Sequence, residues 1–281
     1  MEISLANEHA YQLTPQVPIE VARVRVDDKR TGLVAGTVGA LLSRPKAEDI
    51  QLLSTENRLE PFWLVTIASR TRYDRNRGYT LTVGGPEVQQ VTILEHQVTV
   101  DRQAKGGPSV MLTGIEHCQE EHRVSRFFDG ITGDKDERSK YLTFPALEIP
   151  ALDTFAPEGV LVVPPQAAAT AVVRQVMAEV VKPVQALMIH EERVDVENID
   201  LYFRPVYAFE YVWQAKNKHV IVEYDALTGD IHAGGKKLGD QIRGMLTREL
   251  LFDVTADAVG MIVPGGSIAV KLVRAVVDRG K

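Results

Sequence analysis

Alternating apolar and polar residues predict several strands in the first half of the chain. Residues 16–28 alternate in this way, with one apolar side, which predicts a half-buried strand. After Pro61 the chain is rich in β-branched residues, in short segments separated by glycine, proline and asparagine. This texture is typical of an antiparallel sheet. The short strands are expected at 64–67, 79–83, 88–94 and 97–100.

Other segments have the apolar spacing of helices. Residues 33–42 are small and apolar and predict a tightly packed helix that ends at Arg44-Pro45. Residues 166–181 form the clearest helical pattern, which Lys182-Pro183 ends. Strands are then expected at 206–213 and 219–224, and helices at 238–252 and from Ser267 onward.

A proline-rich segment divides the chain. Five prolines lie between residues 145 and 165, and this density predicts an extended connector at a domain boundary. The chain is therefore expected to have an α+β fold of two helix-plus-antiparallel-sheet units with a helical C-terminal extension. The expected boundaries are 1–144 for a first unit with extra strands, 145–165 for the connector, 166–235 for the second unit and 236–281 for the extension.

Short echoes in the sequence indicate a relation between the two units. Pro61 and Pro205, each before an apolar strand segment, lie 144 positions apart (205 − 61). The pattern Asp-x-x-Thr-Gly-Asp occurs at 129–134 and again at 225–230, only 96 positions apart (225 − 129). Either the first unit holds about 48 additional residues of strand and turn, or one echo is accidental. An internal duplication and a chance similarity are both open, because helix-then-hairpin units are common.

The second unit resembles a PepSY-type module. Residues 166–231 carry a helix and then a meander that closes on the segment Val222-Glu223-Tyr224-Asp225-Ala226-Leu227-Thr228-Gly229-Asp230-Ile231. Modules of that family are typically non-catalytic inhibitory or interaction domains of exported proteins. The resemblance implies a small α+β module that binds a partner.

Composition narrows the class of protein and its compartment. The 281 residues include 32 basic and 38 acidic side chains, a net charge of −6, and 44% hydrophobic residues. These values exclude a disordered or fibrous chain and a nucleic-acid binder that is basic throughout. The single cysteine, Cys118, excludes an intrachain disulfide. The N-terminus lacks the pattern of a secretory signal, and Pro264-Gly265-Gly266 interrupts the most apolar segment, so a soluble, cytoplasmic protein without a transmembrane segment is expected.

The densest group of metal-binding residue types lies between residues 116 and 122. His117, Cys118 and His122 are all acceptable zinc donors, and carboxylates lie between them. On a strand His117 and His122 would point to opposite faces, so this segment alone cannot close a metal site. A zinc site would need a further ligand such as His190 from the second unit. The alternative is a polar connection in which Cys118 is a small buried residue.

Four arginines and one tyrosine gather on a predicted hairpin. Such a group can contact phosphates and stack on a base, bind an acidic partner protein, or keep an exposed hairpin soluble. The residues are Arg70, Arg72, Tyr73, Arg75 and Arg77.

No catalytic motif is complete in the sequence. There is no Gly-x-Ser-x-Gly nucleophile motif, and Gly265-Gly266-Ser267 fits a helix cap better than a phosphate site. We therefore expect a non-enzymatic binding or assembly protein, without a cofactor, that recognises a protein or peptide through its sheet surface and hairpins. Residues 255–277 are expected to complete the core or to join copies into a homo-oligomer. The alternatives are a zinc-dependent hydrolase using the His/Cys group and a nucleic-acid accessory protein using the arginine hairpin.

Overall fold

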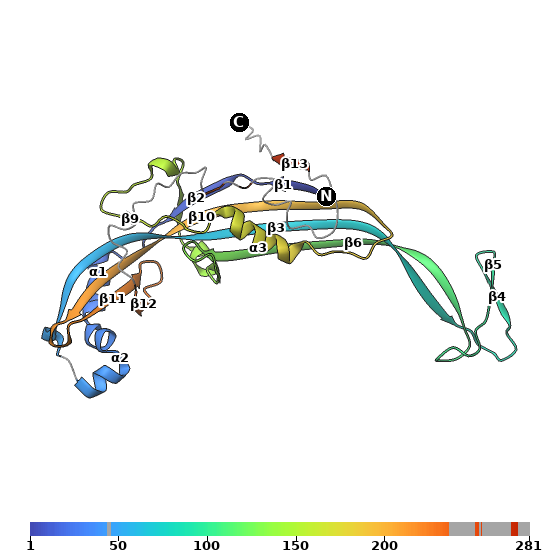
Figure 1. Cartoon of the computed structure of the whole chain (residues 1–281), viewed down its shortest axis with the longest axis horizontal. Coiled ribbons are helices and arrows are strands. Elements are labelled where there is room, and N and C mark those ends of the chain that lie inside the picture. Colours follow the sequence, from blue (N-terminus) through green and yellow to red (C-terminus); the bar gives the residue numbers. More distant parts are fainter. Residues whose placement is uncertain (44–45, 236–250, 253, 255–270, 275–281) are drawn as a thin grey trace.

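The computed structural model describes residues 1–43, 46–235, 251–252, 254 and 271–274. Within these residues it holds one mixed sheet of eleven strands, a separate two-stranded hairpin and three α-helices. The sheet forms a long arch, with α1 and α2 at one end and a two-stranded extension at the other (Figure 1). The strands are β1 (Glu2–Leu5), β2 (Glu8–Leu13), β3 (Ile50–Thr82), β4 (Gln90–Ile93), β5 (His96–Thr99), β6 (Ser109–Asp129), β7 (Lys135–Asp136), β8 (Ala146–Glu148), β9 (Leu161–Val162), β10 (Met188–Trp213), β11 (Lys218–Asp225), β12 (Ile231–Ala233) and β13 (Lys271–Arg274). The helices are α1 (Ile19–Asp27), α2 (Arg30–Ser43) and α3 (Ala169–Val180).

Three long strands account for the length of the sheet. β3 lies between β10 and β6 and is antiparallel to both. β10 pairs with β3 from Met188 opposite Asp74 as far as Trp213 opposite Ile50. On its other edge β10 pairs with the parallel strands β1 and β2 and with the antiparallel strand β11.

The expected α+β fold of two helix-plus-sheet units with a helical C-terminal extension is wrong. β3 and β10, which were assigned to different units, are neighbours in one sheet along almost the whole of β10. The segments 64–67 and 79–83, expected as separate strands, belong to the single strand β3 or follow directly on it. Pro61 does not interrupt β3, because its nitrogen faces a gap between two partner strands. On the edge of β3 away from β10, the pairing with β9 ends at Leu59 and the pairing with β6 starts at Phe62.

The strand expected at 16–28 is also wrong, because α1 occupies most of that segment. Pro18 precedes the first turn, and Ala22 and Val26, four residues apart, are the buried positions of the helix. Val21 and Val24 are exposed, although their alternation suggested a strand. The segment forms a helix because the four-residue spacing of Ala22 and Val26 places both side chains on the one helical face that packs on the sheet.

The C-terminal residues in the described part also differ from expectation. The helix expected from Ser267 onward is wrong over 271–274, where β13 pairs in parallel with β1. All of the helix expected at 238–252 except residues 251–252, the Gly265-Gly266-Ser267 motif and most of 255–277 lie outside the described residues. The helix expected at 166–181 is confirmed as α3, and the expected hairpin of 88–94 and 97–100 is confirmed as β4–β5. None of the helices in the described ranges is long and apolar enough to cross a membrane.

Helices cover the sheet in two places and create two cores. The apolar side of α3 packs against β3, β6 and β10, around the fully buried Trp63 and Phe203. α1 and α2 pack against the other end of β10 and against β11, around Phe209 and Tyr211. The connector expected at 145–165 contains β8, which pairs with β2, and β9, which pairs with β3.

The two Asp-x-x-Thr-Gly-Asp turns have matching hydrogen bonds. Asp129 Oδ1 accepts the backbone N–H groups two and three residues later, at 2.9 and 2.9 Å, and Asp225 Oδ1 does the same at 2.9 and 3.1 Å. The backbone N–H of the residue directly after each aspartate donates to the carbonyl oxygen of a proline, from Gly130 to Pro61 at 3.0 Å and from Ala226 to Pro205 at 3.1 Å. The two segments thus share one turn conformation, and the internal duplication stays a prediction. The extra residues form the longer β3–β6 hairpin, and both turns belong to one sheet.

Candidate interaction site

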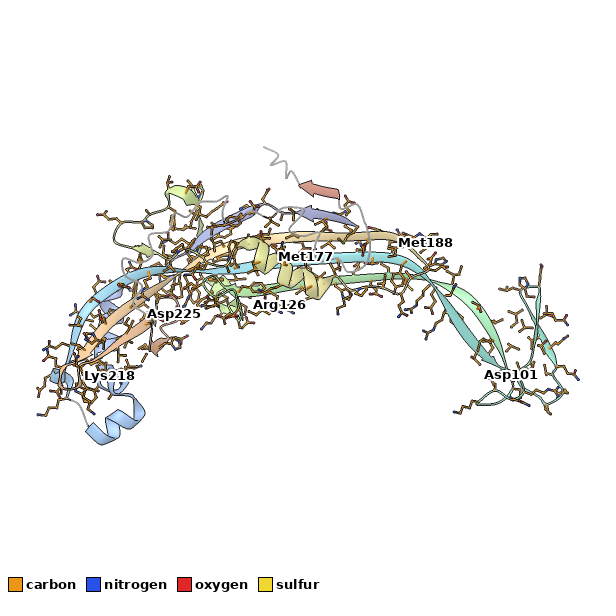
Figure 2. All side chains as sticks on the ribbon, in the orientation of Figure 1. Asp101, Arg126, Met177, Met188, Lys218 and Asp225 are labelled. Atoms are coloured by element: carbon orange, nitrogen blue, oxygen red, sulfur yellow. The ribbon has the colours of Figure 1, made fainter. Side chains whose placement is uncertain are left out.

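The β3–β6 hairpin continues beyond the three-stranded part of the sheet. β10 begins at Met188 opposite Asp74, whereas β3 and β6 remain paired as far as Thr82 and Ser109. We call residues 75–82 and 109–116 the arm. Figure 2 shows Met188 near the point where the arm leaves the body and Asp101 at the far end. A two-stranded ribbon alone is at best marginally stable in water. The arm therefore needs further contacts for stability, either with residues 83–108 at its end or with a partner.

The arm exposes large apolar side chains on both faces. Met111 is 71% exposed and Ile115 is 55% exposed, and the two lie on one face because alternate residues of a strand point the same way. Tyr79 and Leu81 are exposed on the opposite face of the ribbon. Gly78 lies opposite Thr113 on the face that carries Met111 and Ile115. Because glycine has no side chain, the surface is depressed at this position. Apolar groups gathered in this way on a projecting element mark an interaction surface.

The expected arginine patch is largely neutralised in the folded chain. Arg70 contacts Glu121 at 2.8 Å and Arg75 contacts Glu116 at 2.6 Å across the β3–β6 pair. Arg72 lies 3.7 Å from Glu191 on β10. The positive charges of these three side chains are therefore matched by carboxylates, as in an ordinary charged sheet surface.

Tyr73 and Arg77 complete the predicted group. Tyr73 is buried and donates its hydroxyl to Glu120 at 2.6 Å. The hydrogen bond to this carboxylate is the main reason that the pKa of Tyr73 rises to about 12. Glu116 has a lowered pKa, chiefly because Arg75 and Tyr79 donate hydrogen bonds to it, and the charge of Arg77 contributes. Tyr73 is thus not available to stack on a base.

Two of the predicted metal-binding histidines meet at the base of the arm. Asp74 Oδ1 lies 2.6 Å from His117 Nδ1, and Asp74 Oδ2 lies 2.8 Å from His190 Nε2. The backbone of Asp74 also accepts the N–H of Leu187 at 2.6 Å. One carboxylate thus joins β3, β6 and β10 where the third strand ends.

The other two predicted ligands do not join this cluster. His122 lies 3.7 Å from Glu120, and its odd–even relation to His117 on β6 places it on the other face. The thiol of Cys118 lies 3.8 Å from the backbone oxygen of Glu116 on its own strand. Among the described residues no group of three or more His, Cys, Asp or Glu side chains has the arrangement of a metal site.

We expect Asp74 to make the stability of the protein depend on pH in acid. Hydrogen bonds from His117 and then His190 lower the pKa of Asp74. A lowered pKa in the folded state stabilises the protein at pH values above the ordinary carboxyl range, and this contribution is lost as the pH falls through the folded-state value. The free energy of urea unfolding should therefore be higher for the wild type than for Asp74→Asn at pH 7, and the two values should converge towards pH 2. The control is Glu95→Gln, in the exposed turn between β4 and β5. If Asp74→Asn lowers the free energy of unfolding by the same amount at both pH values, the stabilising role of the ionised Asp74 carboxylate is contradicted.

Two groups of functional interest escaped the sequence patterns. Arg58 on β3 is 1% exposed and bonds to Glu56 and Glu223. Asp200 on β10 is 4% exposed, and its Oδ1 has no hydrogen-bond partner among the described residues. In the sequence Arg58 and Asp200 are each a single polar residue among alternating apolar and polar positions. The only sequence signal that bears on their burial is this strand pattern. That pattern predicts a solvent-facing side chain unless the neighbouring strands are known.

Comparisons with known proteins bear on neither the fold nor the site. No family model matches the chain, and no curated protein and no solved structure is significantly similar to it. The PepSY-type resemblance is supported only by the residues that suggested it.

Proposed function

We propose that this chain is a soluble, cytoplasmic, non-enzymatic binding protein whose arm engages a protein or peptide partner. The observation that carries the proposal is the arm itself, a two-stranded ribbon that exposes Met111, Ile115, Tyr79 and Leu81. These side chains contribute nothing to the hydrophobic cores of the described body. We therefore infer that these four side chains contact a partner protein or peptide.

The arm has the backbone as well as the side chains for such a contact. Beyond Asp74, β3 has no strand on the side that β10 occupies in the body, within the described residues. Over the described ranges, β6 pairs on its outer side with β7, at Phe127 and Phe128, and forms one isolated bridge from Ser109 to Asp101, which leaves most of this edge of the arm open. An extended peptide that adds to either edge would satisfy the unpaired N–H and C=O groups, and alternate apolar side chains would select its sequence.

The two alternative functions have less support. A zinc hydrolase needs ligands that converge on one point, whereas His117 and His190 bond to different oxygens of Asp74 and His122 lies elsewhere. A nucleic-acid role needs unpaired positive charge, whereas three of the four arginines face carboxylates. A protein partner is compatible with both observations.

We expect a photo-crosslinking amino acid at Met111 to capture a specific protein in extracts of the source cells. The control places the same amino acid at Leu147 on β8, which is 63% exposed and lies far from the arm in sequence and in the sheet. The captured protein is then purified, and its affinity for Met111→Ser and Ile115→Ser chains is measured. Loss of two apolar anchors should weaken binding by about tenfold or more.

Deletion of the arm separates a folding role from a binding role. Asp74 and His117 face each other in register, so a short glycine-containing turn can replace residues 75–116. The cores hold no arm residues, so the unfolding midpoint should change little while partner binding is lost. Identical captured proteins at Met111 and Leu147, capture abolished by nuclease, or undiminished binding by the deleted chain would each overturn the proposal.

A further inference from the structure

Asp200 is a buried carboxylate that the fold does not satisfy. It lies in the middle of β10, between β2 and β3, and is 4% exposed. Asn198 donates one hydrogen bond to Oδ2 at 3.2 Å, and Oδ1 has no partner in the part of the chain that the structure describes. Burial raises the pKa of this carboxyl group. A buried, unpaired acceptor of this kind costs folding free energy and calls for a functional explanation.

The side chain lies on the sheet face that α3 does not cover. Its neighbours in sequence, Ile199 and Leu201, belong to the core beneath α3, so Asp200 points the other way. On its own face it is directly opposite His9 of β2 and Leu64 of β3. Tyr202, the next residue of β10 on this face, stacks on a second tyrosine, Tyr11 of β2, with 5.0 Å between the ring centres.

Two hollows in the surface adjoin this position. A hollow of about 380 Å³ includes His9, Asn198, Asp195 and Glu197 in its lining, and one of about 290 Å³ includes His9 and Glu148. Both lie where the chain passes from β1 to β2, beside the shift in register of β10 near Val196. Asp200 itself lines neither hollow. It lies behind two side chains that line the larger one, its cross-strand neighbour His9 and its hydrogen-bond donor Asn198, so a ligand reaches Oδ1 only when one of these side chains moves aside.

Negative charge predominates around the hollows. Five carboxylates, those of Glu8, Glu148, Asp195, Glu197 and Asp200, share the region with the guanidinium groups of Arg193 and Arg123. Arg193 pairs with Asp195, and Arg123 pairs with Glu197. Glu148 faces only His9, at 3.1 Å, among the contacts of the described residues. Glu148 and Asp200 therefore have no permanently charged partner among the residues that the structure describes.

We propose that Asp200, Asn198 and His9 form the base of a binding site for a primary ammonium group. The group would donate a hydrogen bond to Asp200 Oδ1 and would supply the positive charge that the buried carboxylate lacks. An ammonium group has three donors and no acceptor, which suits a site made of carboxylate and carboxamide oxygens. The alkyl chain that carries it would lie in the larger hollow, and that chain is either a small alkylamine or a lysine side chain.

Other occupants fit less well. A water molecule could bond to Oδ1 but would leave the charge of the carboxylate uncompensated. An anion would be repelled by the five carboxylates. A neutral apolar group would add to the desolvation of Asp200 without providing a donor. The ammonium group is the chemistry that corrects both the missing hydrogen bond and the missing charge.

The test is a titration of the full-length chain with n-butylamine, followed by NMR of the Asn198 side-chain amide and the His9 ring. 1-Butanol, with the same chain and no charge, is the neutral probe, and Nα-acetyl-lysine methylamide represents a lysine side chain. The wild type is expected to show saturable shifts with n-butylamine, and Asp200→Asn to bind it about tenfold or more weakly. Glu158→Gln, an exposed carboxyl in the connector, should bind like the wild type.

Each outcome decides the proposal. Saturable binding of both amines, lost in Asp200→Asn, supports the site, and binding of only one amine identifies whether a free alkylamine or a lysine side chain is its source. Equal binding by the wild type and Asp200→Asn, equal shifts with 1-butanol, or no saturable shift with either amine would overturn it. The unfolding midpoint of Asp200→Asn is measured alongside to show that the variant is folded. The result does not depend on the arm, so it is independent of the proposed partner.

Discussion

Replacing Arg58 by methionine should lower the free energy of unfolding by about 3–5 kcal/mol, the largest effect that we expect from a single substitution. The Arg58 side chain is 1% exposed and lies 2.6 Å from Glu56, 3.2 Å from Glu223 and 3.9 Å from Glu60. These contacts join β3 to β11 across the sheet. Without the guanidinium group, three carboxylates would be left close together with less positive charge between them, and that repulsion and desolvation destabilise the folded state.

Urea unfolding at pH 7 measures the effect, and Arg70→Met is the matched control. Arg70 also contacts one glutamate across neighbouring strands, at 2.8 Å, but its side chain is 52% exposed. An exposed pair of this kind contributes only about 0–1 kcal/mol, because water and salt screen it. Equal losses for the two variants would show that burial does not strengthen the contribution of Arg58.

Replacing Asp200 by asparagine should have the opposite sign and raise the free energy of unfolding at pH 7 by about 1–3 kcal/mol. Asparagine is close to aspartate in shape, so packing against Leu64 and His9 is kept, and it carries no charge to desolvate. A gain in stability from removing a functional residue is the usual sign that a site is maintained at the expense of the fold.

The pH dependence of this gain follows from the raised pKa of Asp200 in the folded state. Below the ordinary value of 3.8 the carboxyl group is neutral in both the folded and the unfolded chain, so the wild type and the variant should be nearly equally stable. As the pH rises above that value, the unfolded chain ionises first and the wild type loses stability relative to Asp200→Asn. The difference is then constant above the folded-state pKa.

Measurements at pH 3 and pH 7, with Glu158→Gln as the control, distinguish this account from a packing effect. A gain that is the same at both pH values would argue that shape, and not charge, is responsible. Saturating n-butylamine should narrow the difference at pH 7, because a ligand that binds the folded wild type raises its stability. No narrowing would count against the ammonium site but leave the electrostatic account of Asp200 intact.

The sequence predicted the parts of this protein that local patterns determine. The apolar spacing of 166–181 predicted α3, and the alternation around two short turns predicted β4–β5 and β11. The two Asp-x-x-Thr-Gly-Asp segments found in the sequence form turns, because aspartate accepts nearby N–H groups and glycine takes the required positive φ, 76° at Gly133 and 81° at Gly229. Each of these features depends on residues within one helix or hairpin.

The candidate sites were predicted only in part. The convergence of His117 and His190 was considered from residue type alone, but the carboxylate that joins them, Asp74, was not. The arginine hairpin was predicted as a binding surface, and its neutralising glutamates lie on other strands that the hairpin's own sequence does not identify. Asp200 had no signal, because its burial depends on His9 and Leu64, which lie 191 and 136 positions away (200 − 9 and 200 − 64).

The sequence by itself thus determined the two turns, α3, the short β4–β5 hairpin and β11. Only the tertiary structure decided that β3 and β10 share one sheet, that the β3–β6 hairpin extends past the last residue paired to β10, and that Arg58 and Asp200 are buried. The physical reason is that periodicity reports which side of a strand is apolar, whereas pairing and burial depend on contacts between residues far apart in the chain. A strand with alternating residues has the same pattern at a solvated edge and in the middle of a sheet.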